Sequence, residues 1–174
     1  MLILVRHAMP AHGPDVPARD WGLAPEGREA TRSLCSRLPA GARLVASSEP
    51  KAVGTLEAAG RALEDPRFDE VVRVEAYSDD FRTQRLAYVE GSDHAEWEAR
   101  GEVVRRFGAG VADHLAAADG QPLVIATHGM AMTLWLTATI GLGDPGAFWA
   151  DLRFPDAQVV DLAAGTVARL GSSA

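Results

Sequence analysis

The chain begins with Leu2-Ile3-Leu4-Val5, a run of apolar residues that leads directly into Arg6-His7. Continuous rather than alternating hydrophobicity predicts a strand that is buried on both faces of its sheet. A second run, Leu123–Ala126, has the same character and leads into Thr127-His128-Gly129. Strands of this kind belong to parallel sheets that helices cover on both sides, so the two runs favour an α/β fold.

Helices and further strands are expected to alternate along the rest of the chain. The expected strands are Arg43–Ala46, a weak one at Arg67–Val74, and a terminal hairpin of Gln158–Leu162 and Thr166–Leu170. The expected helices are Glu26–Leu38, Pro50 to about Ala62, Asp79–Val89, Ala95–Ala118 and Met130–Ile140, and the expected loops are Ala8–Pro25 and Gly141–Gly146. This order predicts a three-layer α/β/α sandwich with a mostly parallel central sheet, in a single domain spanning residues 1–174.

Composition and charge exclude several classes of protein. Hydrophobic residues make up 47% of the chain and charged residues 24%, which is typical of a folded globular protein. The single cysteine, Cys35, excludes an internal disulfide and a cysteine-rich zinc site. The net charge of −7, without a basic run, makes nucleic acid and anionic membranes poor partners. Because no membrane-length apolar segment or basic leader is evident, we expect a cytoplasmic protein.

Polar clusters follow three of the expected strands: Arg6-His7, Ser47-Ser48 with Lys51, and Thr127-His128-Gly129. Ligands of open α/β sheets bind beyond the carboxyl ends of the strands, where these clusters would meet. Together they would form an anion site that suits phosphate. Its donors would be Arg6, Lys51, the Ser48 hydroxyl and the first N–H groups of a helix at Pro50. A neutral imidazole there is a nucleophile that can accept a phosphoryl group.

Leu4-Val5-Arg6-His7 resembles the Arg-His-Gly signature of the histidine phosphatase (phosphoglycerate mutase-like) superfamily. Three further segments are similar to the family in the same order, and the resemblance spans nearly the whole chain. These segments are Leu23-Ala24-Pro25-Glu26-Gly27 with Ala30, Ser47–Ala52 with Thr55, and Leu123–Gly129.

The resemblance implies a metal-independent phosphatase, without a cofactor, that acts on phosphomonoesters or phosphohistidine. His7 would be the nucleophile that becomes phosphohistidine, and Glu70 would protonate the leaving oxygen and then activate water, with Glu75 as the runner-up. His128 would also stabilise the transition state. The predicted phosphate-binding residues are Arg6, Ser48, Lys51, His128 and Gly129. The expected partner is a small phosphorylated substrate or inorganic phosphate, and a homodimer is an open option.

Two residues depart from the family pattern. Ala8 replaces the glycine that follows the catalytic histidine, so its methyl group would crowd the pocket or its backbone would differ. Lys51 replaces an arginine, which keeps the charge and loses the forked geometry. A non-catalytic phosphate-binding module with a degenerate site is therefore one alternative. A mutase-type phosphotransferase is another, which ranks lower because the chain is short.

Overall fold

The first apolar run forms β1 (Leu2–Arg6), an interior strand of a six-stranded sheet with the order β3-β2-β4-β1-β5-β6. The computed structural model describes residues 1–74 and 81–171. Strands β1, β2 (Arg43–Ala46), β3 (Leu63–Glu64) and β4 (Leu123–Thr127) are parallel. The predicted terminal hairpin forms β5 (Asp156–Asp161) and β6 (Thr166–Arg169), and β5 pairs antiparallel with β1. The prediction of a mostly parallel α/β sheet is confirmed.

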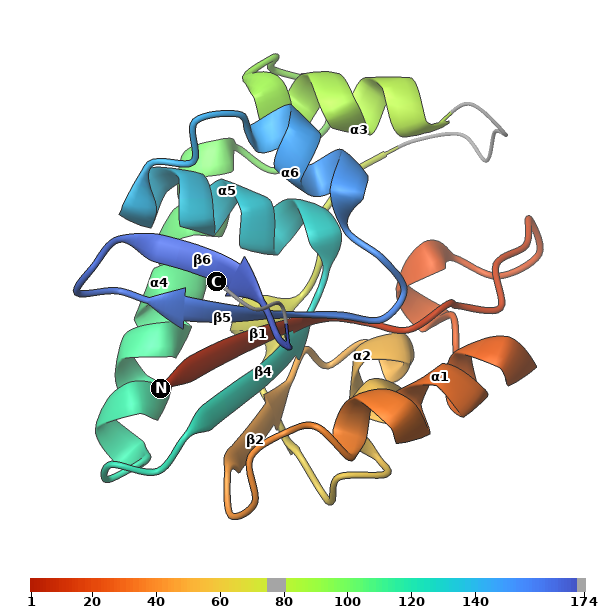
Figure 1. Cartoon of the computed structure of the whole chain (residues 1–174). Helices are drawn as coiled ribbons and strands as arrows, with labels where there is room; N and C mark the ends of the chain where they lie inside the picture. Colours follow the sequence, from red (N-terminus) through yellow and green to blue (C-terminus); the bar gives the residue numbers. More distant parts are fainter. Residues whose placement is uncertain (75–80, 172–174) are drawn as a thin grey trace.

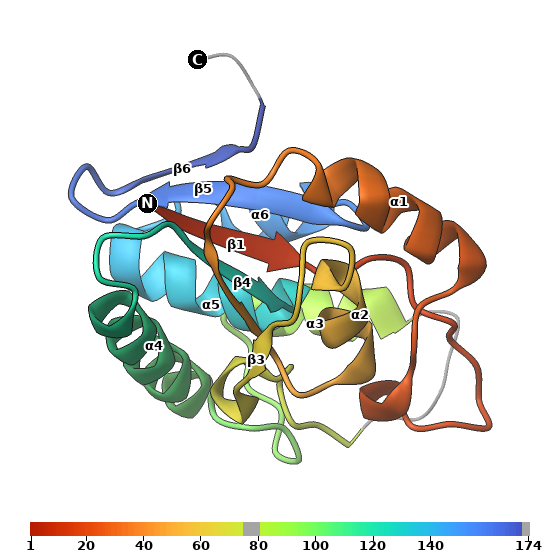
Figure 2. The same cartoon turned by 90° about the horizontal axis from the view of Figure 1, so that it is seen from below.

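Helices cover both faces of this sheet, as Figures 1 and 2 show. Ile3 and Val5 pack with α1 (Pro25–Cys35) and α2 (Pro50–Leu56) on one face. Leu2 and Leu4 belong to the larger core on the other face. That core contains residues of α3 (Phe81–Glu90), α4 (Arg100–Ala117), α5 (Gly129–Ile140) and α6 (Pro145–Asp151). Alternate side chains of β1 thus enter two cores, which explains why its apolar run is continuous.

Several elements differ from the expectation, and short-range polar contacts account for two of them. In place of a strand over residues 67–74, a 3₁₀ turn forms at Pro66–Phe68, because the Asp65 carboxylate accepts the amide of Arg67 at 2.9 Å. Helix α6 begins inside the loop expected at residues 141–146, with its N-terminus capped by Asp144 and Pro145 in its first turn.

Three helices are shorter than expected, and the first of them, α1, ends at Cys35 rather than at Leu38. Helix α2 ends at Leu56, and α4 begins only at Arg100, so that Trp97 precedes it and forms a bridge with Arg73. In residues 1–74 and 81–171, no helix is both long and apolar enough to cross a membrane.

Candidate active site

Strands β1 and β4 deliver the two predicted histidines to the same point. The strands are parallel neighbours, and Arg6 lies opposite Thr127 in their register. The next residues are His7 and His128, whose ring centroids are 5.1 Å apart. Both residues are buried, and the amide of His7 donates to the Thr127 carbonyl at 3.0 Å. The sequence prediction that these distant segments meet is confirmed.

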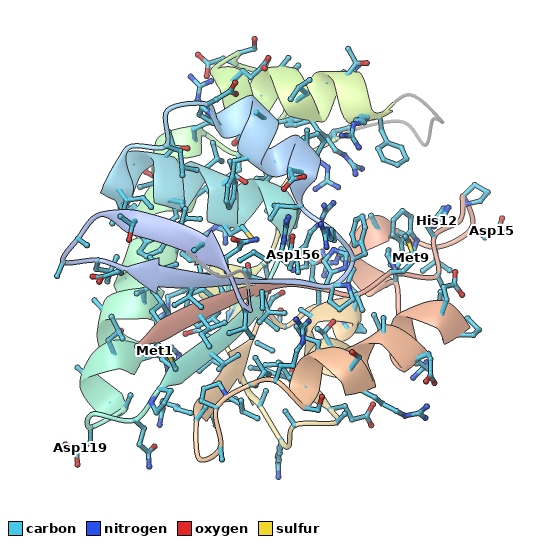
Figure 3. The ribbon with its side chains drawn as sticks, viewed as in Figure 1. Met1, Met9, His12, Asp15, Asp119 and Asp156 are labelled. Atoms are coloured by element: carbon cyan, nitrogen blue, oxygen red, sulfur yellow. The ribbon has the colours of Figure 1, made fainter. Side chains whose placement is uncertain are left out.

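A cavity of about 700 Å³ opens at this end of the sheet. It is lined by all seven residues that the sequence predicted: Arg6, His7, Ser48, Lys51, Glu70, His128 and Gly129. The loop of residues 8–24 forms one wall, and Figure 3 shows His12 on this loop near Met9. His12 is exposed. Glu75, the alternative to Glu70, lies outside the described residues.

The immediate surroundings of His7 fix its tautomer. Its Nδ1 lies 2.8 Å from the Ala8 carbonyl, which can only accept, so Nδ1 carries the hydrogen. Nε2 therefore has a lone pair in the neutral ring. Burial, and after it the charge of Lys51, lowers the pKa of His7 well below 6.5. The ring is thus neutral at physiological pH and has the electronic form of a nucleophile.

Ala8 fits the site without backbone strain. Among the described residues other than glycine, only Asp119 has a positive φ, so Ala8 adopts an ordinary conformation. Its side chain is fully buried, and its amide donates to the Thr55 hydroxyl at 2.9 Å. The alanine in place of the family glycine therefore requires no left-handed backbone here.

Arg6 is held from two sides by residues that lie far away in the sequence. Its Nη1 donates to the Leu152 carbonyl at 2.7 Å, and its Cζ lies 3.6 Å from the centre of the Phe154 ring. Its Nε is buried and has no partner in the described part of the chain. Burial lowers the pKa of Arg6 to about 10, so the guanidinium remains charged at neutral pH.

Gly129 allows this position of Arg6. A Cβ atom on Gly129 would lie 3.3 Å from Arg6 Nε and 3.0 Å from Trp149 Nε1. Both distances are shorter than ordinary van der Waals contacts. Gly129 is therefore required for a close approach rather than for a special backbone angle.

His128 is positioned through a serine and a carboxylate. Its Nε2 lies 2.8 Å from the Ser47 hydroxyl oxygen, and that hydroxyl donates to Asp69 Oδ1 at 2.7 Å. Ser47 therefore accepts a hydrogen from Nε2, so in the neutral ring Nδ1 carries the lone pair. That Nδ1 is buried without a partner among the described residues. Burial, then the nearby His7 and Lys51, lowers the pKa of His128 well below 6.5.

Ser48 lines the cavity, but its donors are already used. Its amide and its hydroxyl each donate to Asp69 at 2.7 Å. The N-cap of α2 is Glu49 rather than a serine, and its side chain makes no capping bond. Asp69 thus ties both serines of the Ser47-Ser48 pair to the segment that carries Glu70.

Lys51 is the buried cation of the site and is already paired. Its Nζ donates to Glu49 Oε2 and, at 2.7 Å, to the Ala18 carbonyl of the 8–24 loop. An ammonium group has three donors, so one is left for a ligand. Sequence reasoning missed Glu49, although an acid between Ser48 and Pro50 in an otherwise cationic cluster was a visible signal.

Glu70 lies at the N-terminus of α5. Its carboxylate accepts the amides of Ala131 at 3.0 Å and Met130 at 3.4 Å. Its own carbonyl accepts from Arg106 at 3.2 Å. The first turn of α5 therefore fixes this carboxylate in the wall of the cavity, beside the histidine that precedes the helix.

Further arginines that the sequence reasoning missed also line the cavity. They are Arg19, Arg73, Arg82 and Arg85. Arg82 is exposed, and its Nη2 donates to the Ala150 carbonyl at 3.3 Å. With Arg6 and Lys51, these arginines outnumber the carboxylates of the cavity lining, which are Asp20, Glu49, Asp69 and Glu70, although the whole chain is acidic. In the described part of the chain, no group of three or more His, Cys, Asp or Glu side chains is arranged to hold a metal ion.

The sequence matches a family model, and the fold resembles solved structures. A family model described as histidine phosphatase superfamily (branch 1) matches residues 2–165. No curated protein matches the sequence.

Three solved structures resemble the fold. A mycobacterial glucosyl-3-phosphoglycerate phosphatase is 20% identical, with 90% of this chain and 87% of that chain covered and a TM-score of 0.69. YhfR of Bacillus stearothermophilus is 20% identical, with 97% and 94% covered and a TM-score of 0.68. A Thermus thermophilus protein is 24% identical, with 98% and 99% covered and a TM-score of 0.66.

Proposed function

Because the chain belongs to the histidine phosphatase superfamily (branch 1), we propose that it is a metal-independent phosphatase that works through a phosphoryl group carried on His7. The observation that carries this proposal is the pair of buried imidazoles with ring centroids 5.1 Å apart, beside the half-buried Arg6 and the buried Lys51. Two buried polar atoms at this point, Arg6 Nε and His128 Nδ1, have no partner in the described chain. Such atoms are costly unless a ligand satisfies them.

Phosphate binding uses these atoms directly. Arg6 Nε donates to a phosphoryl oxygen, and Lys51 offers its third donor. In the neutral ring, His128 Nδ1 presents a lone pair, which a phosphate oxygen repels. The arriving dianion favours protonation of His128, and its Nδ1–H then donates to the phosphate. Binding of phosphate is therefore coupled to uptake of a proton.

The chemical step begins from the neutral His7. The lone pair of Nε2 attacks phosphorus, the N–P bond forms and the P–O bond to the leaving group breaks. Glu70 takes up a proton from solvent when the anionic substrate binds, and gives it to the leaving oxygen. The ring then carries a phosphoryl group on Nε2 and a hydrogen on Nδ1, and the Ala8 carbonyl that accepts this hydrogen stabilises the positive ring. Water then attacks phosphorus, Glu70 takes a proton from it, and inorganic phosphate leaves His7.

The substrate in this proposal is a small phosphorylated compound. Structures of the mycobacterial glucosyl-3-phosphoglycerate phosphatase are complexes with VO3 and with inorganic phosphate, which supports an anion site of this kind. Three further arginines of the cavity lining, Arg73, Arg82 and Arg85, favour substrates with a second anionic group. A screen of phosphorylated metabolites with and without a second acidic group measures this preference.

One observation favours the non-catalytic alternative. Glu49 compensates the charge of Lys51, which weakens the attraction for phosphate. Turnover of an aryl phosphate in the presence of a chelator separates the two functions. We expect turnover by the wild type and by His94→Ala, because His94 does not line the cavity, and none by His7→Ala. Equal background rates in all three proteins, with phosphate or vanadate still bound, would establish the binding module instead. A mutase-type phosphotransferase would pass the group to an acceptor hydroxyl rather than release free phosphate.

A further inference from the structure

We infer that Glu49 is a positioning residue that holds Lys51 back from the phosphate and so keeps inorganic phosphate weakly bound. This inference rests on the proposed phosphatase function and deepens it. A hydrolase must release the phosphate that it forms, and a site with less net positive charge releases a dianion more readily.

The contacts of Glu49 place it at the centre of the site. Its Oε2 pairs with Lys51 Nζ, and its Oε1 accepts the amide of Glu70 at 2.9 Å. The same Oε1 lies 3.5 Å from His128 Nε2. The residue is 8% exposed and also lines the cavity. Glu49 therefore contacts three predicted site residues at once.

Carboxylates offset the positive charges around the two histidines. Arg6 and Lys51 are positive, Glu49, Asp69 and Glu70 are negative, and burial keeps both histidines neutral. Because the Lys51 and Glu49 side chains are only 6% and 10% exposed, solvent screens their pairing weakly. Loss of the Glu49 charge makes the site more positive by one charge and frees a second donor of Lys51 for the phosphate. We expect phosphate to bind more tightly as a result.

The pH dependence of phosphate binding should show the same link. The groups that face Glu49 are Lys51 from α2, His128 before α5, and Glu70 from the segment after the 3₁₀ turn. Burial raises the pKa of Glu49, so acidification neutralises it more readily than an exposed glutamate. Phosphate affinity in the wild type should therefore rise as the pH falls. Protonation of His128 acts in the same direction, so only the part of the slope that Glu49→Gln removes belongs to Glu49.

The test measures the dissociation constant of inorganic phosphate by calorimetry between pH 5 and 8. Glu49→Gln keeps the size of the side chain, and we expect phosphate to bind at least tenfold more tightly near pH 8, with a shallower pH dependence. Glu57→Gln removes the same charge from an exposed position at the end of α2, outside the cavity. It should leave the constant within twofold. In the double variant Glu49→Gln/Lys51→Met, the gain should disappear, because Lys51 carries it.

The outcomes separate this inference from the proposed function. A role limited to folding predicts a lower melting temperature with equal or weaker phosphate binding, and that result would overturn the inference. If Glu49→Gln does not fold, Glu49→Asp provides the test. It withdraws the carboxylate from Lys51 by one methylene, so phosphate should bind at least threefold more tightly. A wild type that turns over aryl phosphates while Glu49→Gln binds phosphate no more tightly refutes the inference alone. A wild type with neither turnover nor phosphate binding refutes the proposed function.

Discussion

Replacing Gly129 with alanine tests how Arg6 reaches the phosphate. The new methyl carbon would lie 3.3 Å from Arg6 Nε and 3.0 Å from Trp149 Nε1, so both neighbours must move by a few tenths of an ångström. Arg6 has little freedom to move. Its Nη1 is bonded to the Leu152 carbonyl at 2.7 Å, and its guanidinium lies over the Phe154 ring. The displacement therefore falls on Nε, the donor that we assign to the phosphate.

The size of the effect follows from the strength of that donor. A hydrogen bond to a charged group contributes about 1.5–3 kcal/mol. Loss of about 1.4–2 kcal/mol of this contribution corresponds to a fall in kcat/KM of about tenfold to thirtyfold. Stability should change little, because alanine is favoured over glycine in a helix by up to about 1 kcal/mol, which offsets the tight contacts.

The assay is kcat/KM for an aryl phosphate, with the melting temperature measured in parallel. Gly101→Ala is the matched control, because Gly101 also lies in the first turn of a helix and its added methyl would meet nothing within 4 Å. It should keep full activity. A folded Gly129→Ala enzyme with unchanged kcat/KM would refute the assignment of Arg6 Nε as a phosphate donor.

The other predictions concern the cation, the proposed acid and the two rings. Lys51→Ala should lower kcat/KM at least tenfold, which corresponds to about 1.4 kcal/mol, because it leaves the Glu49 charge uncompensated beside the phosphate. Lys51→Arg should keep most of the activity. An unchanged kcat/KM in Lys51→Ala would show that Lys51 does not belong to the site. Glu70→Gln should slow the hydrolysis of alkyl phosphates more than that of aryl phosphates, since aryl leaving groups need less protonation. If Glu75→Gln shows this pattern instead, Glu75 is the general acid. Because the fold lowers the pKa of His7 and of His128, the unfolded chain binds protons near pH 6.5 that the folded chain does not. The free energy of unfolding should therefore fall as the pH drops below about 6.5, by up to about 1.4 kcal/mol per pH unit for each ring. His7→Gln should reduce that slope in denaturant titrations, and an identical slope contradicts the assigned burial.

Local pattern was sufficient for the centre of the fold and for the pair of histidines. Continuous apolar runs identified β1 and β4, and the polar residues that end them are adjacent because the strands are parallel neighbours. Residues just after such strands meet at one edge of the sheet, and the conformation of the loops does not change this. His7 and His128 could thus be placed together from sequence alone.

What the sequence could not provide depends on contacts between distant segments. Arg6 is held by Leu152 and Phe154, which lie more than 140 positions further along the chain, and no local pattern predicts that contact. Lys51 was expected to be available to phosphate, yet its pairing with Glu49 became visible only once burial placed both side chains in the cavity. The turn at Asp65 was missed because its side-chain bond to an amide competes with a strand.

A phosphoryl group trapped on the enzyme during turnover tests the central claim most directly. Turnover of a labelled phosphomonoester is stopped in base, and the modified peptide is mapped by mass spectrometry. We predict a phosphoryl group on Nε2 of His7 that survives base, is lost in acid and is absent from His7→Ala. Label on a serine or a carboxylate, or full turnover by His7→Ala, would contradict it.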